Sequence, residues 1–446
     1  MFERPDAGES AIVVHVTFKQ FGRSPDLDEF LELVTSAGAS AIETVTATRD
    51  RPDPRYFIGT GKADTLKALV RDSHADVVLV NHELSPAQER NLEGLLECRV
   101  IDRTRLILDI FAQRARSFEG KLQVELAQLK HLSTRLVRGW THLERQKGGI
   151  GLRGPGETQL ESDRRMLGLR IKQINTKLSR VRTQRQQSAR SRKRALLSTV
   201  SIVGYTNAGK STLFNHLTGS EVFAADQLFA TLDTTLRRFD VTGEHPALLS
   251  DTVGFIRDLP PELIAAFQAT LEETADAALL LHVVDSNSSE ANDNISEVHR
   301  VLERLGAHET PMVEVFNKID LHPDMAPHVE RGPDGQVTRV WMSAATGAGT
   351  HLLLEAIAER LNVTKVQRRI ILPPQAGRLR AKLFALGAVV DESVLESGDW
   401  AIEITLAETR WETLLEKIAP ELKDFVIVDD DESTTSIRLR QQIAAI

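Results

Sequence analysis

The sequence predicts a multidomain α/β protein, on the strength of its length, two regions of alternating strands and helices, and one long helical stretch. With 446 residues the chain exceeds what one hydrophobic core usually organises, so two to four domains are expected. In the two alternating regions, short apolar runs follow amphipathic stretches, a pattern typical of parallel sheets covered by helices. We expect an N-terminal α/β domain at 1–120, a helical hairpin at 121–195, a second α/β domain at 196–364 and a small α+β domain at 370–446.

The bulk composition is that of an ordinary globular protein, with 41% hydrophobic, 26% charged and 5% aromatic residues. The longest apolar run, near 277–284, is too short to cross a bilayer, so we expect no membrane span and a cytoplasmic location. We also expect a monomer. The single cysteine, Cys98, excludes a disulfide framework and a multi-cysteine metal site. A net charge of −8 argues against a uniformly basic nucleic-acid binder.

The first region alternates strands and helices, which predicts a small domain with a largely parallel sheet. We expect strands at 11–18, 41–47, 76–80 and 98–101, and helices at 27–37, 61–72 and 86–96. The run Gly59-Thr-Gly-Lys62 lacks the spacing of a phosphate-binding loop. We therefore favour a turn that opens a helix there over a second nucleotide site.

The helical region predicts two antiparallel helices. Leucines between Leu122 and Leu136 fall on one face, and the apolar residues from Leu167 to Val181 have heptad-like spacing. A Gly-rich break at 148–156 separates the two seams and predicts a flexible tip. Beyond Arg182 the seam becomes polar and basic, which suggests a linker.

The second helix of this hairpin is strongly basic, with twelve Lys and Arg and no Asp or Glu in 164–194. A solvated coil is one interpretation, but surface helices normally alternate charges, and a polycation attracts nucleic-acid phosphates. Because aromatic residues for base stacking are few, we expect RNA contact driven by shape. The candidate RNA-binding residues are Arg145, Lys147, Arg153, Arg164 and Arg165.

The second α/β region places polar motifs directly after apolar strands, which we expect at 199–203, 247–250, 278–284, 312–316 and 340–342. The segment from 204 to 211 fits the P-loop pattern between a strand and a helix, where backbone N–H groups surround phosphates. Lys210 would reach the β- and γ-phosphates, and Ser211 would bind Mg²⁺. The phosphate-binding candidates are Gly204, Tyr205, Thr206, Asn207, Ala208, Gly209, Lys210, Ser211 and Thr212.

A second motif, Asp251-Thr-Val-Gly254, begins 41 residues after Lys210. Asp251 would bind Mg²⁺ through water, and the Gly254 N–H would meet the γ-phosphate. A threonine between the motifs should sense the γ-phosphate and bind the Mg²⁺, and we favour Thr231. The alternatives are Thr234 and Thr235. The residues expected to act on the transferred phosphate are Lys210, Thr231 and Gly254.

The third and fourth motifs predict guanine recognition. The Asp320 carboxylate can accept both N–H groups of guanine's Watson–Crick edge, which adenine does not match, and the wrong base would leave this carboxylate unpaired. Asn317 would brace neighbouring loops, and Lys318 would lie along the base. Backbone N–H groups of the next motif would meet the guanine oxygen, from Ser343, Ala344 and Ala345. In this order the motifs predict a Ras-like G domain.

Phe255 occupies the position where many G domains place a glutamine that orients the attacking water, and a phenyl ring cannot do so. We therefore expect slow intrinsic GTP hydrolysis that a partner or a monovalent cation such as K⁺ completes. Asn207 would either help to hold that cation or brace the loop.

Several stretches together resemble the HflX family of bacterial GTPases. They are Arg55-Tyr-Phe-Ile-Gly-Thr-Gly-Lys62, Ile101-Asp-Arg-Thr104, Ile107-Leu-Asp-Ile-Phe-Ala-Gln-Arg-Ala-Arg116, Gly120-Lys-Leu-Gln-Val-Glu-Leu-Ala-Gln-Leu129, Gly148-Gly-Ile-Gly-Leu-Arg-Gly-Pro-Gly-Glu-Thr-Gln-Leu160, the P-loop and the segment 251–256. The resemblance extends to about residue 364, and 373–390 is similar to the family's C-terminal extension. A hydrophobic residue at 255 also matches the family pattern.

The resemblance implies a cytoplasmic GTPase that binds the large (50S) ribosomal subunit and its RNA and separates stalled ribosomes, especially under heat stress. The N-terminal and helical domains would contact the ribosome, with GTP driving binding and hydrolysis driving release. Two other functions stay open. One is a GTPase acting in ribosome assembly or RNA modification, and the other is a membrane regulator acting through a protease. The latter would need an amphipathic or lipid-anchored segment, for which the sequence shows no signal.

Overall fold

The computed structural model divides into two compact units, one formed by 1–239, 247–328 and 341–350 and the other by 240–246, 329–340 and 351–446. The residues that the structure describes are 8–19, 26–144, 155–194, 197–220, 228–229, 231, 235–241, 246–257, 276–361, 365–395, 397–407, 411, 414–425 and 427–429.

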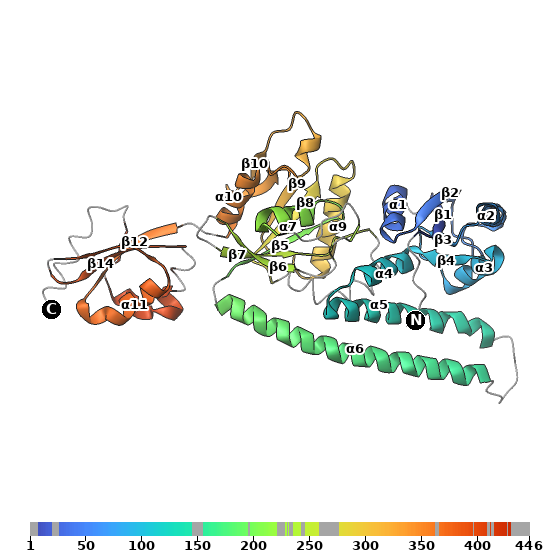
Figure 1. Ribbon diagram of the computed structural model, residues 1–446, viewed down its shortest axis with the longest axis horizontal. Coiled ribbons are helices and arrows are strands. Elements are labelled where there is room, and N and C mark those ends of the chain that lie inside the picture. The colour runs from blue at the N-terminus through green and yellow to red at the C-terminus, as the bar shows by residue number, and fades with distance from the viewer. Residues whose placement is uncertain are drawn as a thin grey trace. The chain divides into compact units, whose positions relative to one another are not determined.

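The first unit begins with a four-stranded parallel sheet in the order β2-β1-β3-β4 (Figure 1). The strands are β1 (Ser10–Phe18), β2 (Ser40–Arg49), β3 (Val77–Val80) and β4 (Arg99–Asp102). Alternate residues of β1 enter cores on opposite faces of the sheet, because successive side chains of a strand point to opposite sides. The parallel sheet confirms the prediction from the alternating pattern.

Four helices cover this sheet. Helices α2 (Thr60–Ser73) and α3 (Pro86–Leu96) contribute to one core, and α1 (Leu27–Ser36) and α4 (Arg103–Arg114) to the other. Gly59 has a φ of 85° and lies at the N-terminus of α2, so this run is the expected helix-opening turn. Helix α4 was not predicted from the sequence. Its neighbouring residues Leu106, Ile107 and Leu108 are all buried, so no one-sided apolar stripe marks the helix.

Two long helices follow, α5 (Phe118–Glu144) and α6 (Pro155–Arg194), and Figure 1 shows them side by side. Their shared core contains three buried residues, Leu122, Leu126 and Ile174, as the leucine seam predicts. Ion pairs Arg170–Glu125 and Arg185–Glu119 also connect the helices. The linker expected beyond Arg182 is wrong, since α6 continues as helix to Arg194.

The rest of the first unit contains a sheet in the order β9-β8-β5-β7-β6. Its strands are β5 (Thr199–Gly204), β6 (Thr235–Asp240), β7 (Pro246–Asp251), β8 (Leu279–Asp285) and β9 (Met312–Asn317). The central pairs, β5 with β7 and β8 and β8 with β9, are parallel. The carboxyl ends of these strands therefore lie at one edge, where α/β sheets bind ligands. Helix α7 (Lys210–Thr218) follows β5, and α9 (Ala291–Arg304) follows β8.

The second unit contains β10 (His328–Arg331), β11 (Val337–Trp341) and α10 (Thr350–Arg360), followed by a C-terminal sheet in the order β13-β14-β12-β15. The C-terminal strands are β12 (Lys365–Leu372), β13 (Val389–Val394), β14 (Trp400–Ala407) and β15 (Ile427–Asp429). Helix α11 (Gly377–Ala385) contributes Leu379 and Leu383 to their core. A π-helical turn at Leu414–Ile418 follows β14 and contributes Leu414 to the same core. Among the described residues, no helix is long and apolar enough to cross a membrane.

Candidate nucleotide-binding site

The P-loop lies between β5 and α7, at the carboxyl edge of the sheet. Gly209 precedes the first residue of α7 with a φ of 90°, a left-handed conformation that favours glycine. A Cβ on Gly209 would lie 2.2 Å from Nδ2 of Asn317, so no larger residue fits. The loop therefore leads into a helix N-terminus whose free N–H groups suit an anion.

Lys210, the P-loop lysine, is buried and turned back onto its own loop. Its Nζ donates to the backbone oxygen of Tyr205 at 2.6 Å. Burial lowers the pKa of Lys210 to about 8, while the nearby Asp251 carboxylate opposes that shift. Phosphate oxygens would favour the charged form of this ammonium group by the same Coulombic effect.

Three oxygen-bearing side chains expected to bind Mg²⁺ come together beside Lys210. The Ser211 hydroxyl lies 2.7 Å from the Thr231 hydroxyl and donates to Oδ2 of Asp251 at 2.9 Å. Oδ1 of Asp251 is buried and has no hydrogen-bond partner among the described residues. Burial raises the pKa of Asp251, and a divalent cation would favour its charged form. This all-oxygen set fits Mg²⁺, which prefers such ligands.

The candidates for the γ-phosphate-sensing threonine have different positions. Thr231 reaches Ser211, whereas Thr235 is the first residue of β6 and Thr234 lies outside the described residues. Leu228 and Phe229, just before Thr231, contact the N-terminal domain. The Leu228 N–H donates to the Ser36 hydroxyl at 3.1 Å, and the Phe229 ring packs edge-on against that of Phe111.

Phe255 is held through its backbone at the start of the P-loop. Its N–H donates to Gly204 O at 3.1 Å, and its carbonyl accepts from the Thr206 N–H at 2.8 Å. Its phenyl ring is 2% exposed and belongs to the hydrophobic core. Position 255 therefore offers no polar group to orient a water molecule.

The guanine motif follows β9 and connects three loops. Nδ2 of Asn317 donates to Ala208 O at 2.9 Å, and Oδ1 of Asn317 accepts from the Ala344 N–H at 2.8 Å. Lys318 Nζ lies 2.7 Å from Oδ2 of Asp285, which ends β8. Asp285 was not predicted from the sequence, although an acidic residue at the end of an apolar strand could have indicated it.

The base-recognition candidates lie in two neighbouring loops. Asp320 is exposed in a short 3₁₀ turn that begins directly after Lys318. In the second loop the Ser343 hydroxyl accepts from the Thr346 N–H at 3.2 Å, and Ala345 is exposed. The Ala344 N–H donates to the Asn317 side chain, which also donates to Ala208 O, so Asn317 connects both loops to the P-loop.

A buried polar network, not predicted from the sequence, also connects the P-loop with the N-terminal domain. The Tyr205 hydroxyl donates to the Glu29 carboxylate and accepts from the Arg257 N–H at 2.9 Å. Arg103 forms an ion pair with Glu29 and also donates to Arg257 O at 3.2 Å. No local motif signals these contacts, because they join residues far apart in the sequence.

Of the RNA-binding candidates, Arg164 and Arg165 are exposed on α6. The other three lie outside the described residues, namely Arg145, Lys147 and Arg153.

Comparison with known proteins agrees with this geometry. Three family models match, described as GTP-binding GTPase N-terminal at 24–112, GTP-binding GTPase Middle Region at 114–192 and 50S ribosome-binding GTPase at 199–318. "GTPase HflX" of Escherichia coli K12 is 56% identical over 427 residues, covering 96% of this chain and 100% of that protein. The chain belongs to the HflX GTPase family.

Other HflX proteins are also similar. "GTPase HflX" of Caldanaerobacter subterraneus is 45% identical, covering 83% of this chain and 85% of its own. Among solved structures, a GTP-binding protein from the archaeon Sulfolobus solfataricus in complex with GDP is 23% identical, with a TM-score of 0.41, covering 79% of this chain and 98% of that one. As a member of the HflX family, the chain hydrolyses GTP to GDP and phosphate. P-loop GTPases bind their nucleotide with Mg²⁺.

Proposed function

We propose that this HflX-family chain binds the RNA of the large ribosomal subunit in its GTP state, as a monomer in the cytoplasm, and separates stalled ribosomes under stress. Hydrolysis then releases it. The family model at 199–318 is described as a 50S ribosome-binding GTPase, which supports the partner. The single observation that carries the proposal is the basic surface of α6.

This basic surface consists of exposed cationic side chains along a helix anchored to its neighbour. Its members are Arg164, Arg165, Lys172, Lys177 and Arg180. The pairs Arg170–Glu125 and Arg185–Glu119 attach α6 to α5. Several exposed cations along one long helix suit the phosphates of structured RNA, since binding releases condensed counterions.

The segment before Thr231 supports coupling between nucleotide and RNA binding. Thr231 lies in the expected Mg²⁺ site, and two residues just before it contact the N-terminal domain through Ser36 and Phe111. GTP with Mg²⁺ would fix Thr231 and so favour one arrangement of this segment. The nucleotide state thereby biases the surface that the N-terminal domain presents.

Partner-stimulated hydrolysis follows from Phe255, whose buried ring cannot orient the attacking water. We propose that the ribosome completes the site and that K⁺ contributes through the exposed Asn207 of the P-loop. GTP turnover measured with and without ribosomal subunits, in K⁺ and in Na⁺, tests both parts. Rapid turnover by the chain alone in Na⁺ contradicts them.

Sucrose-gradient sedimentation of assembled ribosomes with a non-hydrolysable GTP analogue tests the splitting function. We expect separated subunits and co-migration of the chain with the large subunit. The double variant Arg164→Glu and Arg165→Glu should reduce the affinity for the large subunit at least about tenfold. It should also make that affinity less dependent on salt concentration, since each phosphate contact adds to the salt dependence. Arg304→Glu, an exposed charge reversal on α9, is the control and changes the net charge by half as much.

Three outcomes contradict the splitting function. Intact ribosomes, with no co-migration of the chain and the large subunit, would contradict the splitting function directly. Preferential association with subunit precursors would favour the assembly or RNA-modification function. Equal losses of subunit binding in the α6 variant and in the Arg304→Glu control would contradict the assignment of the RNA contact to α6.

A further inference from the structure

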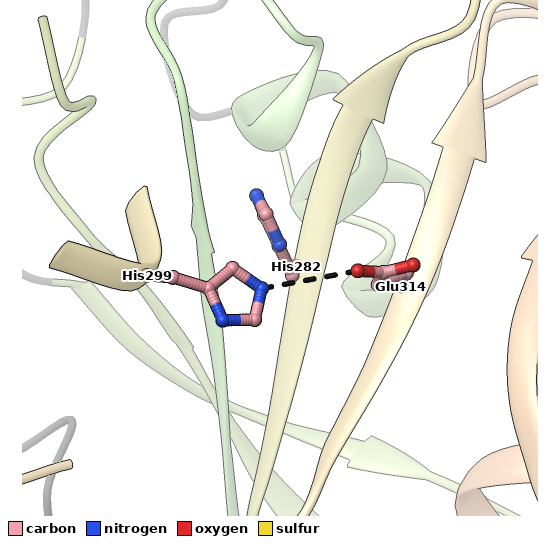
Figure 2. A group of neighbouring side chains, drawn as sticks. All are labelled: His282, His299 and Glu314. Carbon is pink, nitrogen blue, oxygen red and sulfur yellow. Dashed lines mark ion pairs between the residues drawn. The ribbon is translucent and has the colours of Figure 1, made fainter. Parts of the chain in front are cut away.

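Two histidines and one glutamate converge on one face of the G-domain sheet, apart from the nucleotide motifs. His282 of β8 and Glu314 of β9 are direct register partners on neighbouring parallel strands, so their side chains leave the same face. His299 comes from α9, whose Val298 and Val301 pack on that face beside Leu280 of β8. Figure 2 shows the His299 ring facing the Glu314 carboxylate, with His282 beside the line that joins them.

The distances within this group suit a shared ion. One potential ligand atom from each residue lies within 4.8 Å of the other two, and His299 Nε2 is 3.8 Å from Glu314 Oε1. Tetrahedral ligands about 2.1 Å from Zn²⁺ are about 3.4 Å apart, so closure needs movements of about 1 Å. His299 and Glu314 are only half-buried, which leaves their side chains room to make that adjustment.

His282 provides the second, independent observation. Its side chain is 1% exposed, and its Nδ1 has no hydrogen-bond partner among the described residues. A buried polar atom without a partner is rare in folded proteins and calls for an explanation. Burial lowers the pKa of His282 to about 3, and Coulombic interactions with His299 and Lys210 act in the same direction. The imidazole is therefore neutral at physiological pH, the form that coordinates metals.

We propose that His282, His299 and Glu314 form a metal site for a zinc-class divalent cation. Two imidazole nitrogens and one carboxylate oxygen form a familiar Zn²⁺ ligand set, and the fourth position is left for water. Mg²⁺ and Ca²⁺ favour all-oxygen sites and are poorly matched. The ion connects β8, β9 and α9 three residues before Asp285 and Asn317, so it braces the elements that carry the guanine loop.

The site is tested on the full chain loaded with GDP and Mg²⁺, which occupies the nucleotide site, after removal of transition metals with a chelator. Zn²⁺ is titrated in competition with a chromogenic chelator, and Co²⁺ is added separately as a spectroscopic probe. We expect one Zn²⁺ per chain, a higher unfolding temperature with Zn²⁺, and visible absorption of four-coordinate Co²⁺.

Variants locate the ion. His299→Gln and Glu314→Gln should each weaken Zn²⁺ binding at least about tenfold and remove the Co²⁺ bands, since each removes one ligand. Both change half-buried residues, and unaltered GDP affinity shows that the domain is folded. His308→Gln, an exposed histidine just beyond α9, is the matched control. Absence of a 1:1 site, or equal Zn²⁺ affinity in all three variants and the wild type, would overturn the proposal.

Discussion

Nδ2 of Asn317 donates a 2.9 Å hydrogen bond to the backbone oxygen of Ala208, so a residue of the guanine loop holds the P-loop directly. The same side chain accepts from the Ala344 N–H at 2.8 Å. Both bonds are buried, and both involve backbone groups that would be unpaired without them. Asn317 thus connects the phosphate-binding loop to both loops expected to contact the base.

Asn317→Ala should weaken GDP and GTP binding together by about 10- to 100-fold, because a buried donor or acceptor left unpaired costs about 1–3 kcal/mol. Equilibrium titration with a fluorescent guanine nucleotide measures the effect. Asn292→Ala, an exposed change at the start of α9, should leave both affinities unaltered. A loss confined to GTP would indicate that Asn317 acts on the γ-phosphate instead of connecting the loops.

Gly254→Ala should impair GTP turnover more than GDP binding. A Cβ at this position would lie 2.8 Å from Cγ2 of Thr206 and 2.9 Å from Nζ of Lys210, so one of the two must move. Displacing the Gly254 N–H or the Lys210 ammonium removes a group expected at the γ-phosphate, and loss of one such donor lowers kcat by about 100-fold or more.

Single-turnover hydrolysis and GDP titration check the Gly254 prediction, with Gly61→Ala as the control because nothing lies within 4 Å of its Cβ. Equal losses of GDP affinity and turnover would show a general disruption of the P-loop and contradict the assigned contact.

The parallel sheets and the motifs at the ends of their strands were predictable from the sequence, because each depends on a pattern of neighbouring residues. The apolar run at 278–284 predicts a buried strand, and the apolar run at 312–316 predicts the strand that Asn317 ends. Helix α4 was not predictable in this way. It is buried on several sides, so its apolar residues show no helical stripe.

Contacts between residues far apart in the chain were also not predictable from the sequence. The Tyr205–Glu29 hydrogen bond joins positions 176 apart, and neither residue carries a local signal for the other. The pairing of His282 with Glu314 depends on strand register, which one sequence does not reveal. Phe255 is intermediate. The sequence shows that position 255 lacks the glutamine side chain of many G domains, whereas only the structure shows that the Phe255 ring is buried in the core.

Asp320→Asn should change the preferred base. The aspartate is expected to accept both N–H groups of guanine, and an amide there favours a base carrying an oxygen in place of the amino group. We expect the GTP to xanthosine triphosphate affinity ratio to fall at least about 100-fold, as at other sites where a hydrogen bond to the substrate is mismatched. Competition titration of the two nucleotides measures it, and Asp324→Asn, exposed in the same loop, should keep the wild-type ratio. An unchanged ratio in Asp320→Asn refutes the base contact.

Asp109 of α4 should destabilise the N-terminal domain at neutral pH. Burial raises its pKa from 3.8 to about 6, with Asp102 contributing and Arg105 and Arg99 opposing. Folding therefore disfavours the charged carboxylate, and the contribution of this group to stability is lost as pH rises from about 4 to 6. Asp109→Asn should stabilise the domain by up to about 3 kcal/mol at pH 7.5 and by only about 1 kcal/mol at pH 4.5.

Native-state hydrogen exchange of the α4 amides at the two pH values measures this difference within the N-terminal domain alone, which avoids the overlapping unfolding transitions of a multidomain chain. Asp72→Asn, an exposed change in α2, should show little gain at either pH. If Asp109→Asn stabilises the domain equally at pH 4.5 and 7.5, the gain comes from packing or hydrogen bonding. The buried charge is then not its cause, because only an ionisable group can produce a pH-dependent difference.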